Sequence, residues 1–165
     1  MEIESLQELL IEEMRDIYSA EVQLTKAMPK MVKKASNPQL KKAFETHLKE
    51  TEGQIQRLQK IFDKLGKKPT GKKCAAMEGL VEEGKEMMGE DMDDETMDAA
   101  LIAVAQKVEH YEIASYGTVR TWARHIGDEQ TAKLLQQTLD EEGKTDKLLS
   151  QLAEKNINIE AARPN

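Results

Sequence analysis

The chain has 165 residues, of which 33% are charged and 4% are aromatic, and its formal net charge at pH 7 is −7. This length allows one domain with a sizeable core. The acidic balance argues against a general nucleic-acid-binding protein, which usually carries a basic patch. A single cysteine, Cys74, excludes an intrachain disulfide and is typical of a reducing compartment. Because no signal-like or membrane-spanning segment is recognisable, we expect a cytoplasmic protein without a membrane partner.

The first 35 residues carry the pattern of one long amphipathic helix. Apolar residues recur every seven positions, and a companion row lies four positions further on: Ile3, Leu10, Ile17, Leu24 and Met31, then Met14, Glu21, Met28 and Ala35. This pattern predicts a seam that packs against neighbouring helices. Pro29 predicts a kink near the helix end. The "SNP" that follows predicts a turn, with Pro38 at the first position of the next helix.

A second helix is predicted from about Pro38 to Leu65, because apolar residues recur at helical spacing and Gly66 can end it in a left-handed cap. Its expected inward residues are Leu40, Phe44, Leu48, Leu58, Ile61 and Leu65. Residues 67–75 are predicted to be a basic loop. A shorter helix, "AAMEGLVEEGKEMMGE", follows, and Gly79 and Gly84 weaken it.

A third long helix is predicted to begin near Asp93, where acidic residues suit the helix dipole, and to end at Gly127. Its expected seam consists of Met97, Leu101, Val104, Val108, Ser115, Val119, Trp122 and Ile126. The last long helix is predicted over about residues 128–155. The chain is therefore predicted to be all-α: an antiparallel four-helix bundle whose long crossover carries a short extra helix. We expect one domain over residues 1–160 and a frayed tail over 161–165.

One acid on each long helix is predicted to lie at the same height in this bundle. Residues equally far from the turn of an antiparallel hairpin share a level, because both helices rise about 1.5 Å per residue. Counted from the two predicted turns, four glutamates lie about fourteen or fifteen residues away: Glu21, Glu50, Glu112 and Glu142. One helical turn further along come Gln54, Glu109 and Asp146.

Several buried carboxylates without partners would each cost several kcal/mol or become protonated. A pair of divalent cations removes this cost, and oxygen-rich sites suit manganese and iron. The sequence therefore predicts a dinuclear site holding two iron or manganese ions. A weak repeat with an offset of roughly ninety residues relates the two helix pairs. This offset pairs Glu50 with Glu141, which leaves Glu141 and Glu142 as alternative ligands.

Five segments resemble the YciE/YciF family of ferritin-like proteins: "YSAEVQL", "HLKETEGQI", "AMEGLVEE", "AVAQKVEHYEIASYGT" and "LDEEGKTDKL". The resemblance covers nearly the whole chain and implies a ferritin-like bundle with a rubrerythrin-type dimetal centre and a role in stress protection. The usual ferritin-like pattern includes two Glu-x-x-His motifs. Here Gly53 and Thr145 stand where those histidines would be. Gln54 and Asp146 are expected to take over their places, which favours manganese or a weaker iron site.

The remaining chemically active residues are interpreted as supporting ones. His47, His110 and His125 are expected to have structural or supporting roles outside the ligand set, and Tyr18 and Tyr111 to be core tyrosines near Glu21 and Glu112. The methionines are expected to serve packing or a dimer surface: Met87, Met88, Met92 and Met97.

Two functions are compatible with these patterns. The first is a homodimeric protein that binds two metal ions and oxidises Fe(II) with oxygen or peroxide, possessing oxidase or peroxidase chemistry. The alternative is a non-enzymatic bundle with a stress or assembly role, in which the acids pair with lysines or become protonated. Few lysines or arginines lie in the predicted seams, which favours the metal-binding function.

Overall fold

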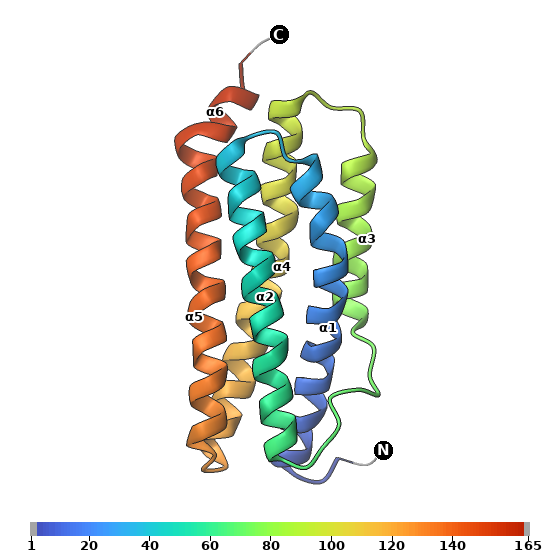
Figure 1. Ribbon diagram of the computed structural model, residues 1–165, viewed down its shortest axis with the longest axis vertical. Helices are drawn as coiled ribbons and strands as arrows, with labels where there is room; N and C mark the ends of the chain where they lie inside the picture. Colours follow the sequence, from blue (N-terminus) through green and yellow to red (C-terminus); the bar gives the residue numbers. More distant parts are fainter. Residues whose placement is uncertain (1–2, 164–165) are drawn as a thin grey trace.

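The computed structural model describes residues 3–163 and is helical over most of that range (Figure 1). The helices are α1 (Leu6–Lys34), α2 (Pro38–Lys64), α3 (Ala75–Gly89), α4 (Asp94–His125) and α5 (Glu129–Leu152), followed by the short η1 (Ala153–Ile157) and α6 (Asn158–Ala161). The predicted all-α four-helix bundle with a short helix in its crossover is thereby confirmed. Within the predicted tail, Ala161 still belongs to α6, and residues 164–165 lie outside the described residues.

Side-chain caps fix where the long helices begin. The Asn37 side chain accepts hydrogen bonds from the backbone N–H groups at the start of α2, and Asp93 and Asp128 do the same for α4 and α5. Such caps satisfy donors that have no partner inside the helix. Gly66 and Gly127 follow α2 and α4 with positive φ angles of 62° and 80°, which glycine adopts without strain.

Two antiparallel helix pairs form the bundle, α1 with α2 and α4 with α5, as Figure 1 shows. The α3 helix lies in the crossover between these pairs and packs against α1 and α4. The α1 helix continues through Pro29 to Lys34, so this proline does not end it. None of the helices in the described part of the chain is both long and apolar enough to cross a membrane.

The apolar core is divided into three clusters. One lies at the end of the bundle where the turn between α4 and α5 is, and it includes Leu10, Ile61 and Leu135. A second lies towards the opposite end, where Met87, Met88 and Met92 pack against Leu101 and its neighbours. The third lies beneath α3. The methionine-rich stretch therefore serves packing in this structure.

On α4, the buried row differs from the predicted seam in its second half. Tyr116 and Ala123 are buried, whereas Ser115 is half-buried and Ile126 is 36% exposed. The row continues from Glu112 in steps of four, three and four residues, as expected for a helix face with 3.6 residues per turn. This rotation brings the Tyr116 hydroxyl group into the centre of the bundle, where a layer of polar side chains interrupts the apolar core.

Candidate metal centre

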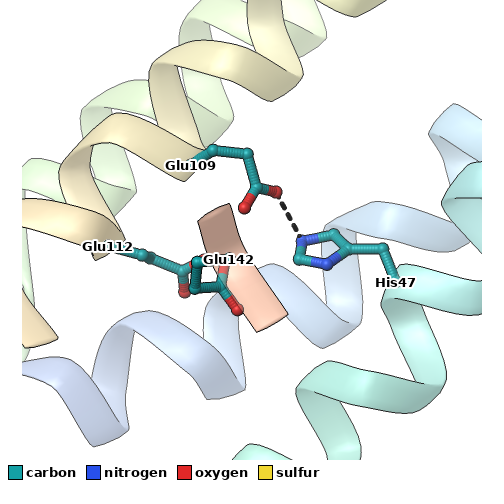
Figure 2. Close-up of side chains that lie close together, drawn as sticks. All are labelled: His47, Glu109, Glu112 and Glu142. Atoms are coloured by element: carbon teal, nitrogen blue, oxygen red, sulfur yellow. Dashed lines mark ion pairs between the residues drawn. The ribbon is translucent and has the colours of Figure 1, made fainter. Parts of the chain in front are cut away.

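Four side chains from three helices converge at the middle of the bundle (Figure 2). His47 comes from α2, Glu109 and Glu112 from α4, and Glu142 from α5. Each offers one potential ligand atom, and these atoms all lie within 4.8 Å of one another. We call these four residues the His–Glu group. Each of them is at most 4% exposed, and Glu21 of α1 and Gln54 of α2 are buried beside them.

Direct contacts tie this group to its surroundings. The Nε2 atom of His47 lies 2.8 Å from an Oε1 atom of Glu109, at ion-pair distance but without hydrogen-bond geometry. The Gln54 amide donates a hydrogen bond to Glu142. The Tyr116 hydroxyl donates to Glu21 Oε1 over 2.5 Å. Each helix of the bundle therefore contributes at least one polar side chain to one connected cluster.

Many oxygens of this cluster lack a hydrogen-bond partner among the described residues. Both carboxylate oxygens of Glu112 are buried without a partner in this part of the chain. The same holds for Oε2 of Glu21, Oε2 of Glu142 and Oε1 of Gln54. A buried acceptor without a partner costs about 1–3 kcal/mol, so several in one place require an explanation. A bound cation would satisfy them together.

Positive charge is scarce around these acids. Four buried carboxyl groups meet here: Glu21, Glu109, Glu112 and Glu142. Within the described range, His47 is the one basic side chain at ion-pair distance from any of them. The nearby Arg57 pairs instead with Glu141. Pairing of these acids with lysines, one of the two forms that the alternative function can take, is therefore absent from residues 3–163.

Burial makes ionisation of these acids unfavourable. It raises the pKa of Glu21 to about 7 and, together with Glu142, raises the pKa of Glu109 to about 12. Burial and the neighbouring Glu21 raise the pKa of Glu112 well above its usual range. Burial is the largest single effect on Glu142 and acts against its charge, but the polar side chains around it, Glu109 and His47 foremost, together outweigh burial and lower the pKa of Glu142. Without a metal, the cluster therefore holds protons that a cation would displace.

Glu50 and Asp146, which the sequence predicts as ligands, are not brought into the His–Glu group. Glu50 is half-buried beside a groove between α2 and α5, where Thr145 Oγ1 donates to it over 3.5 Å. Asp146 accepts hydrogen bonds from the half-buried Gln106 of α4, at a carboxylate oxygen and at its backbone oxygen. Their heights match, but three or four residues along a helix turn a side chain by about 60° or 40°.

Glu142 rather than Glu141 belongs to the His–Glu group. Glu141 lies closer to the surface and receives two hydrogen bonds from the Arg57 guanidinium, over 2.9 and 3.2 Å. Gln54 also donates to Glu141, over 3.0 Å. The adjacent acids thus face different partners, one in the centre and the other towards α2.

The structure separates the three histidines. His47 belongs to the His–Glu group, whereas the His110 side chain is 70% exposed and contacts Asp146. His125 is exposed and contacts the backbone oxygen of Thr121. The sequence-based ligand set left out His47 because it was built from the positions of acidic residues. The signal was present, since buried positions on α2 recur in steps of three and four residues through Leu40, Phe44, His47, Thr51 and Gln54.

The tyrosine that contacts these acids is Tyr116, whereas the sequence predicts Tyr18 and Tyr111 near Glu21 and Glu112. Tyr111 points away from the centre, where its hydroxyl donates to Asp16 over 2.9 Å and lies 3.0 Å from Cys74 Sγ. Tyr18 packs against the apolar cluster that contains Ile61.

The donor set fits a metal of hard or borderline character. Carboxylate oxygens dominate, one imidazole is added, and thiolate is absent from the described group. Such sets suit iron, manganese or zinc rather than copper(I). The residues present therefore could hold metal ions, and the buried oxygens without partners support this interpretation.

Comparisons with known proteins agree along almost the entire chain. The model of a family described as a domain of unknown function, DUF892, matches residues 5–162. Protein YciF of Escherichia coli strain K12 is 47% identical over 162 residues, which cover 98% of each chain.

Solved structures show the same fold. The crystal structure of the E. coli stress protein YciF superposes with a TM-score of 0.90, at 47% identity, over 94% of this chain and 99% of that one. YcfI of Rhodopseudomonas palustris, for which a structural role has been suggested, gives 0.88 at 45% identity over 90% and 95%. A Xanthomonas campestris protein at 22% identity shares the fold, with a TM-score of 0.77 over 94% and 95%. The chain therefore belongs to the DUF892 family and is a relative of the stress protein YciF.

Proposed function

We propose that the chain is a ferritin-like dinuclear carboxylate protein that binds two iron or manganese ions and oxidises Fe(II) with oxygen or peroxide during stress. One observation carries this proposal: several buried carboxyl groups and His47 converge with unsatisfied oxygens and no lysine or arginine pairing with them among residues 3–163. Two divalent cations supply as much positive charge as four carboxylates carry negative charge.

The ligands would come from all four long helices: Glu21, His47, Gln54, Glu109, Glu112 and Glu142. Two bound Fe(II) ions would supply two electrons, which with two protons reduce one peroxide molecule to two water molecules. The chain's own contribution is to exclude water, to hold the carboxylates in register and to release protons from Glu109 and Glu112 on binding. The stress role is supported by the relative YciF, which is a stress protein.

Metal binding can be measured directly. Protein stripped by a chelator should take up about two Mn(II) or Fe(II) ions per chain under anaerobic conditions, as counted by elemental analysis. Replacement of Glu112 by Ala should abolish this uptake, because both carboxylate oxygens of Glu112 lack a hydrogen-bond partner within residues 3–163 and are available to bind metal ions. The exposed Glu52 of α2 offers a matched control, and Glu52→Ala should bind like the wild type.

Oxidation is a separate measurement on the same sample. Anaerobic Fe(II)-loaded protein mixed with oxygen or peroxide should develop absorbance from Fe(III) faster than free Fe(II) does. Light scattering on that sample tests the expected homodimer. Wild-type protein that retains no metal after loading and desalting would overturn the proposal.

A non-enzymatic structural or stress protein is the second candidate, and the role suggested for YcfI favours it. In that case the acids of the cluster stay protonated. Chelation would then leave the melting temperature unchanged, and added Mn(II) would not raise it. The metal-binding function predicts the opposite, since a ligand that binds the native state stabilises it.

A further inference from the structure

A chain of polar contacts runs from the surface of the bundle to the His–Glu group. Arg57 lies on α2, three residues after Gln54, and both face Thr138, Glu141 and Glu142 of α5. The two charged members are partly exposed, with side-chain exposures of 18% for Arg57 and 29% for Glu141. Gln54 and Glu142 are fully buried. The charged pair is thus linked to the cluster through one amide.

The outer part of this chain has a fixed geometry. Arg57 donates to both oxygens of Glu141, over 2.9 and 3.2 Å, and to the hydroxyl of the buried Thr138 over 2.6 Å. Two parallel bonds between a guanidinium and a carboxylate define direction as well as distance. Glu141 is therefore held in one orientation beside Gln54.

The inner part of the chain sets which way the Gln54 amide points. Its Nε2 atom donates to Glu141 and to Glu142 at once. A carbonyl oxygen in that place would face two carboxylates and be repelled, so the opposite orientation of the amide is excluded. Both amide hydrogens are used, and Oε1 is left buried without a partner in the described structure.

The free oxygen lies close to the cluster. Oxygen and nitrogen of an amide share one carbon and are about 2.3 Å apart. Since Nε2 contacts Glu142, Oε1 lies within about 5 Å of the contacted Glu142 oxygen. Neutral amide oxygens bind hard cations. Because Oε1 of Gln54 is already buried, it need not lose water when a metal ion binds.

We propose that Arg57 and Glu141 are positioning residues that lock the Gln54 amide, so that its amino group holds Glu142 and its oxygen serves as a neutral metal ligand. This inference rests on the proposed metal-binding function. It assigns a role to Glu141 that differs from ligation. It also explains why an ion pair at the surface is joined to a buried amide.

Two variants disrupt this chain of polar contacts without changing a residue of the His–Glu group: Glu141→Gln and Arg57→Met. Either should lower Co(II) and Mn(II) affinity about 10- to 100-fold, which is the range typical of residues that orient metal ligands. The visible spectrum of bound Co(II) should change as well, because one oxygen ligand is lost or displaced. Asp140→Asn is the matched control, since Asp140 is an exposed neighbour that contacts Gln136 instead. It should leave affinity and spectrum unchanged.

A structural ion pair would behave differently. Its loss would lower the melting temperature but leave the Co(II) spectrum and affinity as in the wild type, and that result would overturn the positioning role. An equal loss of affinity in the Asp140→Asn protein would overturn it too, because a general charge effect would then suffice.

A metal-free measurement separates this inference from the proposed function. In metal-free protein, the side-chain amide hydrogens of Gln54 should exchange slowly, and Glu141→Gln should speed their exchange at least about tenfold, the factor that corresponds to about 1.4 kcal/mol of lost protection. A Gln54→Glu sample identifies the signals. If wild-type protein binds no metal but exchange responds in this way, the proposed function fails while the lock on Gln54 stands. Unchanged exchange refutes the lock itself.

Discussion

The hydroxyl group of Tyr116 on α4 lies 2.5 Å from Oε1 of Glu21 on α1, although the two residues are 95 positions apart. Both are fully buried, and this hydrogen bond lowers the cost of a carboxylate that burial otherwise opposes. The contact joins the two helix pairs at the level of the candidate metal centre.

Replacement of Tyr116 by Phe should destabilise the metal-free protein. The change leaves Glu21 without this donor, and a buried acceptor that loses its partner costs about 1–3 kcal/mol. Urea denaturation measures the loss. Tyr18→Phe is the control, because Tyr18 packs against an apolar cluster without a hydrogen bond to its hydroxyl in the described structure. Equal stabilities of the two variants would contradict this role of Tyr116.

Stability of the metal-free protein should fall as the pH rises from 5 to 8. Burial raises the pKa of Glu21 to about 7 and those of Glu109 and Glu112 further, whereas an unfolded glutamate titrates near 4.3. A raised pKa in the folded state gives stability that is complete below the unfolded pKa and is lost as pH rises through the folded pKa. Glu142 has a lowered pKa, so its contribution changes only below this window.

Thermal melts in the presence of a chelator test this expectation. The melting temperature should decline over the interval, and Glu21→Gln should decline less because the substituted amide does not titrate. Saturating Mn(II) should reverse the trend, since metal binding displaces protons and strengthens with pH. A melting temperature that rises with pH in the metal-free wild type would contradict the raised pKa values.

The sequence predicted the heights of the polar residues better than their directions. Distance from the turns put Glu21, Glu112 and Glu142 at one level, because the rise per residue is nearly constant, and these three carboxyl groups do lie close together. The same count placed Glu50 at this level and Asp146 one turn further along, but both side chains turn aside from the group. A seven-residue seam does not resolve rotations of about 40–60° around a helix.

Other parts of the centre depend on contacts between distant segments. Tyr116 and Glu21 belong to different helix pairs, so their hydrogen bond follows from how the pairs pack and not from either pattern alone. The boundaries of α1 to α4 were predictable within a few residues because caps and glycines mark them. Local chemistry thus predicts the elements, and packing decides which side chains meet.

His47 and His110 should differ sharply in their effect on metal binding. His47 is buried, and one of its ring nitrogens lies within 4.8 Å of a carboxylate oxygen of each of three glutamates, whereas the His110 side chain is 70% exposed. His47→Ala should weaken Co(II) and Mn(II) binding at least about tenfold. Titrations followed by the Co(II) spectrum measure this, with His110→Ala as the matched control that should bind like the wild type. Equal effects of both changes would place the binding site elsewhere.

Gly84 and Gly79 lie on the same helix, yet alanine should have opposite effects at the two positions. A Cβ atom at Gly84 would lie 2.9 Å from Val104 Cγ1 on α4, whereas at Gly79 it would meet nothing within 4 Å. Valine has a stiff, branched side chain that cannot turn away easily. Gly84→Ala should therefore destabilise the protein by about 1–3 kcal/mol through overpacking. Gly79→Ala should stabilise it by about 0.5–1 kcal/mol, because alanine favours helix. Urea midpoints measure both changes, and a Gly84→Ala protein as stable as Gly79→Ala would show that α3 packs less closely on α4 than this contact requires.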